Sequence, residues 1–247
     1  MKNVLKIFAS ILCLSILLLI LLEERIAYEP YTSVSAAAAN DDTKYPENMP
    51  LIVIDAGHGG EDGGAVSESG VMEKDINLDI ALYLRDFFLQ GGFEVLMIRQ
   101  DDRSVHDDNA ATLREKKVSD IHNRSAVCNS SENNIYISIH QNKFSQSKYS
   151  GAQVFYSENS PLSEILAENI RLSIKSLLQK DNERKIKPAD KSIYILDKAT
   201  VPCVLVECGF LSNERELSLL TSDDYKQSIA YCIYLGFCEF YYNNYDC

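Results

Sequence analysis

The stretch LIVIDAGHGGEDGGAVSESGVMEKD, residues 51–75, decides the fold of this chain. Its apolar run stops at Asp55, which is typical of a strand buried on both faces of a parallel sheet. A glycine-rich segment then carries His58, and Glu73 stands at the start of an amphipathic stretch. A buried strand, a glycine loop and a helix in this order predict an α/β domain whose polar residues gather where the strands end.

The rest of the sequence continues this alternation of strands and helices. The expected helices cover residues 73–90, 112–129, 161–179 and 224–242, and the expected strands cover residues 51–57, 93–99, 134–140, 152–157 and 203–210. The buried face of the first helix is expected to carry Ile76, Ile80, Leu84 and Phe87. The pattern predicts a single three-layer α/β domain, in which helices cover both faces of a twisted, mostly parallel or mixed sheet.

Composition places the chain among globular proteins and excludes one class of partner. Its 247 residues suit one domain of about 200 residues with a hydrophobic core. The net charge is −12, and no cluster of basic residues is present. Since nucleic-acid-binding proteins present a basic face, we expect no nucleic acid partner.

Residues 1–22 are expected to form a signal anchor or a signal peptide. Lys2 and Lys6 precede an apolar run that ends at Leu22, and this run has about the minimal length of a membrane span. The lysines favour an N-terminus inside the cell and a domain outside the cytoplasm. The small-residue stretch SVSAAAAN lies well beyond Leu22, which favours an uncleaved anchor in the membrane.

Residues 23–50 are expected to form a flexible linker, and residues 51–247 the catalytic domain. The linker is rich in Ala, Ser, Glu, Asp, Asn and Pro and has no sustained periodicity. The chain has seven cysteines but no C-x-x-C pair, which argues against a zinc knuckle or a thioredoxin-type site. Buried thiols and disulfides both remain open for the cysteines of the domain.

Polar side chains lie at or just beyond the ends of three of the expected strands: His58, His140 and Glu207. Two neutral imidazoles and one carboxylate are a common ligand set for catalytic zinc, with the fourth position left to water. Glu73 is the natural carboxylate, because the glycines around His58 allow a tight loop that brings the two side chains together. A zinc ion would lower the pKa of a bound water to about 7.

Glu207 fits a different task from the ligands. It is a charged residue within the apolar strand LVECGF, where an unpaired carboxylate is costly to bury. Hydrolysis of an amide needs a carboxylate that accepts a proton from water and passes it to the leaving amine. The sequence therefore makes Glu207 a candidate for acid–base catalysis.

Each of these residues also has an ordinary structural explanation, and the sequence alone leaves both open. His58 is explained as a turn residue, His140 as a core histidine, and Glu73 as a first-turn acid that the helix dipole favours. Glu207 is explained as the partner of an arginine. The other two histidines, His106 and His122, lie in unremarkable positions, an acidic loop and a helix.

Motifs typical of other functional classes are incomplete in this sequence. GHGGEDGG lacks the G-K-[ST] of a phosphate-binding loop and the G-x-G-x-x-G of a dinucleotide site. It is similar to the oxyanion loop of some esterases, but the chain has no G-x-S-x-G nucleophile motif. A thiol hydrolase that uses Cys208 or Cys203 with His140 is the weakest alternative.

Four motifs resemble those of the zinc-dependent N-acetylmuramoyl-L-alanine amidases, the amidase type 3 family. They are IVIDAGHGGEDGGA, EKDINLDIALYL, YISIHQN and VPCVLVECGFLSNERE, and the resemblance runs from about residue 51 to the C-terminus. It implies that His58, Glu73 and His140 hold Zn²⁺ and that Glu207 is the catalytic carboxylate. The implied reaction cleaves the amide between N-acetylmuramic acid and L-alanine in peptidoglycan. Gln141 departs from the small residue that is usual after the histidine, and Ala56 from a frequent proline.

Within that family, the layout most resembles the germination-specific amidases of spore-forming bacteria. The anchor is short, no wall-binding repeats are present, and residues 141–150 leave little room for the autoinhibitory helix of some division amidases. The likeness implies spore cortex glycan strands as substrate, a step towards muramic δ-lactam, and a place in the forespore intermembrane space. A protein partner is not indicated. Two other classes stay open: a catalytically silent wall-binding or regulatory module, and a zinc peptidase that acts within the stem peptide.

Overall fold

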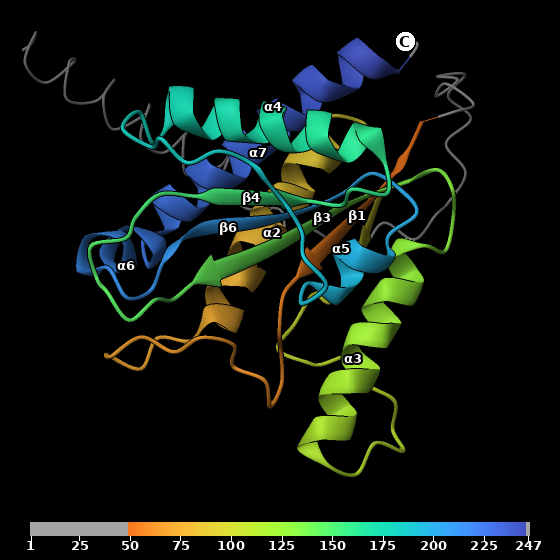
Figure 1. Ribbon diagram of the computed structural model, residues 1–247, viewed down its shortest axis with the longest axis vertical. Coiled ribbons are helices and arrows are strands. Elements are labelled where there is room, and N and C mark those ends of the chain that lie inside the picture. The colour runs from red at the N-terminus through yellow and green to blue at the C-terminus, as the bar shows by residue number, and fades with distance from the viewer. Residues whose placement is uncertain (1–48, 246–247) are drawn as a thin grey trace, which may run out of the picture. The chain divides into compact units, whose positions relative to one another are not determined.

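A six-stranded mixed sheet with helices against both faces organises residues 49–245, which are the residues that the computed structural model describes (Figure 1). The strands are β1 (Leu51–Ala56), β2 (Val95–Met97), β3 (Asn134–Asn142), β4 (Gln153–Tyr156), β5 (Lys187–Pro188) and β6 (Cys203–Phe210). Their spatial order is β2-β1-β3-β6-β4-β5. β1 pairs in parallel with β2 and β3, β3 pairs in parallel with β6, and β4 is antiparallel to β6. The predicted three-layer α/β fold with a mixed sheet is confirmed.

The helices lie on both faces of this sheet. They are α2 (Glu73–Gln90), α3 (Leu113–Cys128), α4 (Pro161–Leu177), α5 (Tyr194–Lys198), α6 (Glu214–Leu220) and α7 (Asp223–Asn244). Helices α2, α4 and α7 pack together on one face, and α3 and α5 lie on the other (Figure 1). β5, α5 and α6 were not expected from the sequence, because elements of 2, 5 and 7 residues are too short to show a clear hydrophobic period.

Side chains along β3 and β6 alternate between the two faces of the sheet, as the pleat of a strand requires. Ile137 and Val206 belong to the core formed with α2, α4 and α7. Tyr136 and Leu205 belong to the smaller core on the side of α3 and α5. This alternation decides which polar side chains near the strand ends point to the face of the sheet that α3 and α5 cover.

Helix α2 has the predicted bounds, with one correction to its buried face. Gly92, at φ 82°, follows the helix and ends it, which few other residues could do without strain. Phe88 is fully buried and continues the four-residue spacing of the apolar face, whereas the expected Phe87 is only half-buried. Phe87 instead contacts the rings of Tyr231 and Tyr234 on α7, with centroids 5.1 and 6.1 Å away.

Residues 143–152, which connect β3 to β4, contain no helix, in agreement with the prediction from their number. The predicted signal anchor over residues 1–22 lies outside the described residues, as does nearly all of the predicted linker. Across residues 49–245, no helix has the length and apolar character needed to cross a membrane. The anchor therefore stays a prediction.

Candidate metal centre and active site

A tight loop after β1 carries His58 and depends on its glycines. His58 itself has φ 64°, in the left-handed region that side chains other than glycine rarely adopt. A Cβ atom on Gly57 would lie 2.2 Å from Cε1 of His140, and one on Gly64 would lie 2.6 Å from Oε2 of Glu73. Only glycine allows these close approaches, so the glycines bring the three polar side chains together.

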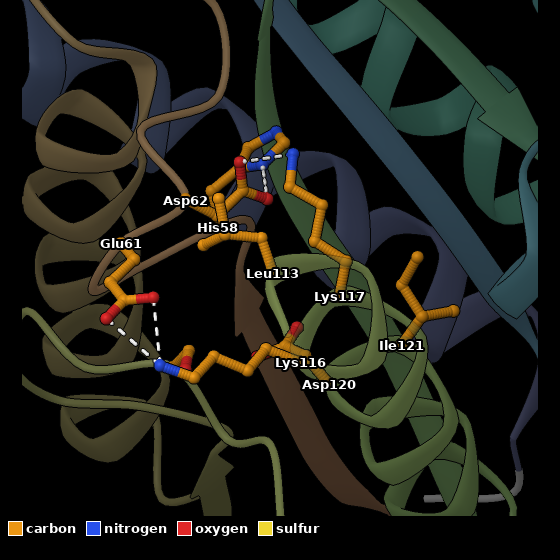
Figure 2. Close-up of a pocket in the computed structure, with 9 residues that line it drawn as sticks. His58, Glu61, Asp62, Leu113, Lys116, Lys117, Asp120 and Ile121 are labelled. Atoms are coloured by element: carbon orange, nitrogen blue, oxygen red, sulfur yellow. Dashed lines mark hydrogen bonds and ion pairs between the residues drawn. The ribbon is translucent and has the colours of Figure 1, made fainter. Parts of the chain in front are cut away.

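His58 is oriented by Asp62 of the same loop. The Nδ1 atom of His58 lies 2.9 Å from Oδ2 of Asp62, and Oδ1 of Asp62 is 3.0 Å from the ammonium nitrogen of Lys117 (Figure 2). The sequence analysis missed Asp62, because a loop has no periodicity that shows which of its side chains meet. The bond to Nδ1 leaves Nε2 of His58 free to face the centre of the site.

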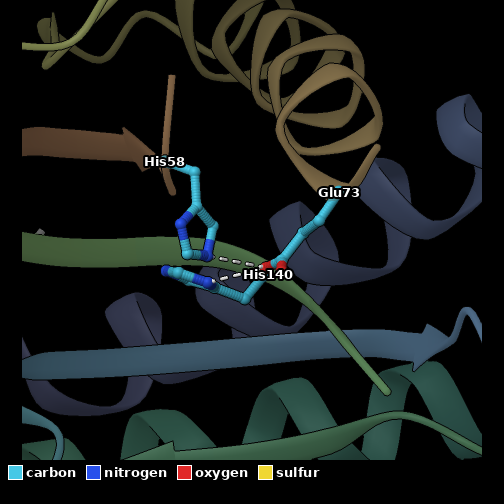
Figure 3. Close-up of side chains that lie close together, drawn as sticks. All are labelled: His58, Glu73 and His140. Carbon is cyan, nitrogen blue, oxygen red and sulfur yellow. Dashed lines mark hydrogen bonds and ion pairs between the residues drawn. The ribbon is translucent and has the colours of Figure 1, made fainter. Parts of the chain in front are cut away.

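The structure brings together the three residues that were predicted as metal ligands. Oε1 of Glu73, at the start of α2, lies 2.9 Å from Nδ1 of His140 and 3.3 Å from Nε2 of His58 (Figure 3). One possible ligand atom from each of the three residues lies within 4.8 Å of the others. The three donors thus converge on one point from a loop, a helix N-terminus and a strand end.

Backbone and side-chain donors fix the carboxylate of Glu73. Its Oε2 accepts a hydrogen bond from the backbone N–H of Ala65 at 2.8 Å, and its Oε1 accepts from the backbone N–H of Gln141 at 3.0 Å. The side-chain amide of Asn77, one helical turn further, donates to Oε1 at 3.3 Å. Glu73 is nearly inaccessible to solvent, so these bonds hold it in one orientation.

Opposite charges at this centre shift the pKa values of its members. Burial would lower the pKa of His58, but the carboxylates of Asp62 and Glu73 outweigh burial and raise it to about 9. Burial would raise the pKa of Glu73, but hydrogen bonds to His140 and His58 hold it far below its usual range. The carboxylate of Glu73 therefore stays ionised beside the two imidazoles, as a metal ligand must.

Two buried arginines hold the glycine loop that carries His58 in place. The Arg124 guanidinium forms an ion pair with buried Asp55 and donates to the carbonyl oxygens of Ala56 at 3.0 Å and His58 at 2.7 Å. Nε of Arg99 donates to the same Ala56 oxygen at 2.8 Å. The sequence analysis did not identify these arginines, because their roles arise only from contacts between distant segments.

Glu207 is half-buried beside the three candidate ligands, and no ion pair among the described residues includes it. On β6 it is the residue paired with His140 of β3. Its Oε2 is buried without a hydrogen-bond partner in the described part of the chain, and none of the ion pairs there joins it to an arginine. Burial, assisted by the negative charge of Glu73, raises the pKa of Glu207 to about 7, against the opposing effect of His140. Pairing with an arginine therefore does not explain why a glutamate occupies this position in the strand.

Within residues 49–245, the cysteines and the other two histidines take no part in the cluster. The five cysteines of the described residues are free thiols: Cys128, Cys203, Cys208, Cys232 and Cys238. Burial raises the pKa of the Cys203 and Cys208 thiols well above their ordinary value. Because nucleophilic attack needs a thiolate, this argues against a thiol hydrolase. His106 and His122 lie outside the candidate metal cluster, as expected.

Comparison with known proteins assigns this chain to a class of enzymes. Residues 52–239 match the family model described as N-acetylmuramoyl-L-alanine amidase. The chain belongs to this family, and it is an enzyme of that class.

Its likeness within the family is to germination-type amidases. The chain is 34% identical over 211 residues to the germination-specific N-acetylmuramoyl-L-alanine amidase of Bacillus subtilis, covering 82% of this chain and 86% of the relative. The structure of the CwlD amidase from Clostridioides difficile, solved in complex with the GerS lipoprotein, is 42% identical, with a TM-score of 0.76 and coverage of 79% and 100%. A second amidase structure, from Clostridium difficile 630, is 26% identical, with a TM-score of 0.68 and coverage of 81% and 100%.

Proposed function

We propose that this enzyme uses zinc to cleave the amide bond between N-acetylmuramic acid and L-alanine in spore cortex peptidoglycan. The observation that carries the proposal is the convergence of His58, Glu73 and His140 beside Glu207, whose Oε2 atom is buried and has no hydrogen-bond partner among the described residues. Three protein ligands and one separate carboxylate are what hydrolysis of an amide at a metal requires.

The donor set suits zinc. Two imidazole nitrogens and one carboxylate oxygen form a mixed N/O set, which is common at catalytic zinc sites. The ligands have oriented partners of their own, Asp62 for His58 and Ala65 for Glu73, as metal-binding side chains usually do. When bound, the ion supplies Lewis acidity to the attacking water and to the amide carbonyl.

Glu207 is proposed to move the proton. Its carboxylate accepts a proton as water oxygen forms a bond to the carbonyl carbon, and it returns that proton to the nitrogen as the C–N bond breaks. The products are a muramic carboxylate and the free amine of L-alanine. Burial raises the pKa of Glu207 above its ordinary value, which suits this double role because a group that must both accept and donate a proton works best when its pKa is close to the ambient pH.

The proposed compartment lies outside the cytoplasm, in the forespore intermembrane space. The support is the apolar run that follows Lys2 and Lys6 and the likeness to germination-specific amidases. In that compartment, removal of stem peptides would be a step towards muramic δ-lactam. That space is enclosed by the mother cell, so protease treatment of isolated forespores without their outer membrane tests the location. A domain that stays protected together with the cytosolic proteins of the forespore would contradict it.

Mass spectrometry of digested peptidoglycan tests the reaction. We expect the zinc-loaded protein to release peptides that begin with L-alanine and to leave muramic acid with a free carboxyl group. A zinc peptidase would instead leave L-alanine attached to muramic acid, and a silent module would produce no new termini. Glu207→Gln, which removes the basic oxygen and keeps the size of the side chain, is the control for contaminating hydrolases.

A further inference from the structure

A groove leads away from the candidate metal centre along helix α3. It consists of two cavities of about 240 Å³ each, one between the glycine loop and α3 and the other between α3 and α5. Both cavities are lined by His58, Asp62 and Ile121, and the second also reaches His140. Because the two cavities share these residues, they border the same reaction centre.

Helix α3 turns an apolar stripe that includes Lys117 towards this groove. The other cations of α3 that line it are held by other carboxylates, Lys116 by Glu61 and Arg124 by Asp55 and Asp120. Leu113, Lys117 and Ile121 are spaced four residues apart, so they lie on the same side of the helix (Figure 2). Leu113 is 64% exposed and Ile121 is 40% exposed, which is unusual for large apolar side chains beside a cavity. Such exposed apolar surface next to a reaction centre is typical of a ligand-binding site.

The charge of Lys117 is available to a ligand. Its ammonium nitrogen lies 3.0 Å from Oδ1 of Asp62, whose other oxygen contacts His58, so one carboxylate separates this cation from a candidate metal ligand. The Lys117 side chain is 60% exposed. An exposed ion pair contributes little to stability, so Lys117 can exchange Asp62 for the carboxylate of a ligand. Lys116 lines the same cavity but is less available, because its ammonium nitrogen donates to both carboxylate oxygens of Glu61.

We propose that the groove binds the stem peptide of the substrate and that Lys117 is a specificity-determining residue, which recognises the free carboxylate of the amino acid after L-alanine. The proposal rests on the proposed amidase function, which places the scissile amide at His58 and His140. The peptide then extends from the metal centre, and the neighbouring groove offers apolar walls for its carbon atoms. Lys117 supplies the charge complementary to an acidic peptide, whereas an amidated peptide lacks that partner.

Two synthetic substrates test the proposal: N-acetylglucosaminyl-N-acetylmuramoyl-L-alanyl-D-isoglutamic acid and its D-isoglutamine form. We expect the wild-type enzyme to hydrolyse the acid with a kcat/KM roughly 10-fold above that of the amide, mainly through KM. In Lys117→Gln this ratio should fall to about one, while Lys117→Arg should keep it. Lys175→Gln is the matched control, because it removes the same charge from an exposed pair on α4, where Lys175 Nζ lies 2.7 Å from Glu183.

The outcomes separate this proposal from the proposed function. If both substrates are hydrolysed and Lys117→Gln keeps the wild-type ratio, the role of Lys117 is wrong and the amidase function stands. A loss of zinc in Lys117→Gln with an unchanged ratio would show a structural role and also overturn the proposal. If the wild-type protein hydrolyses neither substrate, calorimetric binding of the two compounds to the zinc-loaded protein decides. The proposal is supported if the wild-type protein binds the acid more tightly than the amide and Lys117→Gln binds both equally. It is overturned if the wild-type protein binds both compounds equally.

Discussion

His140 of β3 and Glu207 of β6 are paired residues on neighbouring parallel strands. Paired residues of parallel strands point to the same face of a sheet, so both side chains continue the rows that face α3 and α5. A proposed metal ligand and a proposed proton carrier are thus spaced by the hydrogen bonds of the sheet. This arrangement gives the two groups a more rigid relationship than a loop could provide.

Replacement of Glu207 separates proton transfer from metal binding. Glu207→Gln should retain zinc and lower kcat by about 10²–10⁴-fold, because acid–base groups typically contribute that factor. Glu73→Gln should instead lower zinc content, since Glu73 Oε1 lies between both histidines. Metal analysis and steady-state kinetics on the same preparations check this. If Glu207→Gln lost zinc while Glu73→Gln kept both zinc and activity, the two carboxylates would have to exchange roles.

The raised pKa of Glu207 predicts a pH-dependent cost to stability. The pKa is about 7 in the folded protein and ordinarily 4.5, so folding disfavours the ionised form. The cost is absent well below pH 4.5, grows between pH 4.5 and 7, and reaches roughly 3 kcal/mol above pH 7. Metal-free Glu207→Gln should therefore be more stable than the wild type at pH 8, with a smaller difference at pH 5, as measured by urea unfolding. Glu132→Gln, at an exposed position, should show no such trend.

Removal of one imidazole should abolish metal binding. His140→Ala leaves two ligands, which is too few for a catalytic zinc site, so zinc and activity should be lost together. His122→Ala is the matched control, because His122 lies outside the cluster and contacts Tyr194 at 5.1 Å between ring centroids. The assignment of the site is wrong if zinc-loaded His140→Ala turns over at the wild-type rate.

Asp62 should influence the metal through the orientation of His58. Asp62→Ala removes the acceptor 2.9 Å from Nδ1 of His58 and its negative charge. The loss of such a partner typically weakens metal binding about 10–100-fold, and we expect an effect of this size in a competition titration with a zinc chelator. Asp101→Ala, an exposed substitution near the same loop, should leave the affinity unchanged. Equal affinities of the two variants would contradict the role of Asp62.

Replacement of Arg124 should lower the free energy of unfolding. Arg124→Met leaves the buried carboxylate of Asp55 without its ion pair, and the expected loss of unfolding free energy is about 3–5 kcal/mol. The double variant Asp55→Asn/Arg124→Met should recover part of this loss, because no unpaired charge remains buried. Arg85→Met, which breaks a surface pair with Asp86, should cost less than about 1 kcal/mol in the same urea titration.

The class of fold could be predicted from the sequence, and the same sequence named the candidate ligands while leaving their ordinary structural explanations open. The apolar run before Asp55 and the helical spacing from Ile76 to Leu84 depend on local geometry, so strands and long helices were readable from their periods. Glu207 was a candidate because a glutamate within an apolar strand conflicts with ordinary burial preferences, and His58 because it lies just beyond the end of a predicted strand.

The tertiary structure alone decided how these residues are held and charged. Asp62, Arg99 and Arg124 could not be identified beforehand, because their contacts join segments that only the folded chain brings together. The pKa of Glu207 likewise depends on burial beside Glu73, which no local pattern records. Periodicity reports the environment of a residue along its own element, whereas hydrogen bonds and electrostatic shifts depend on distances between elements, and those distances arise only from packing.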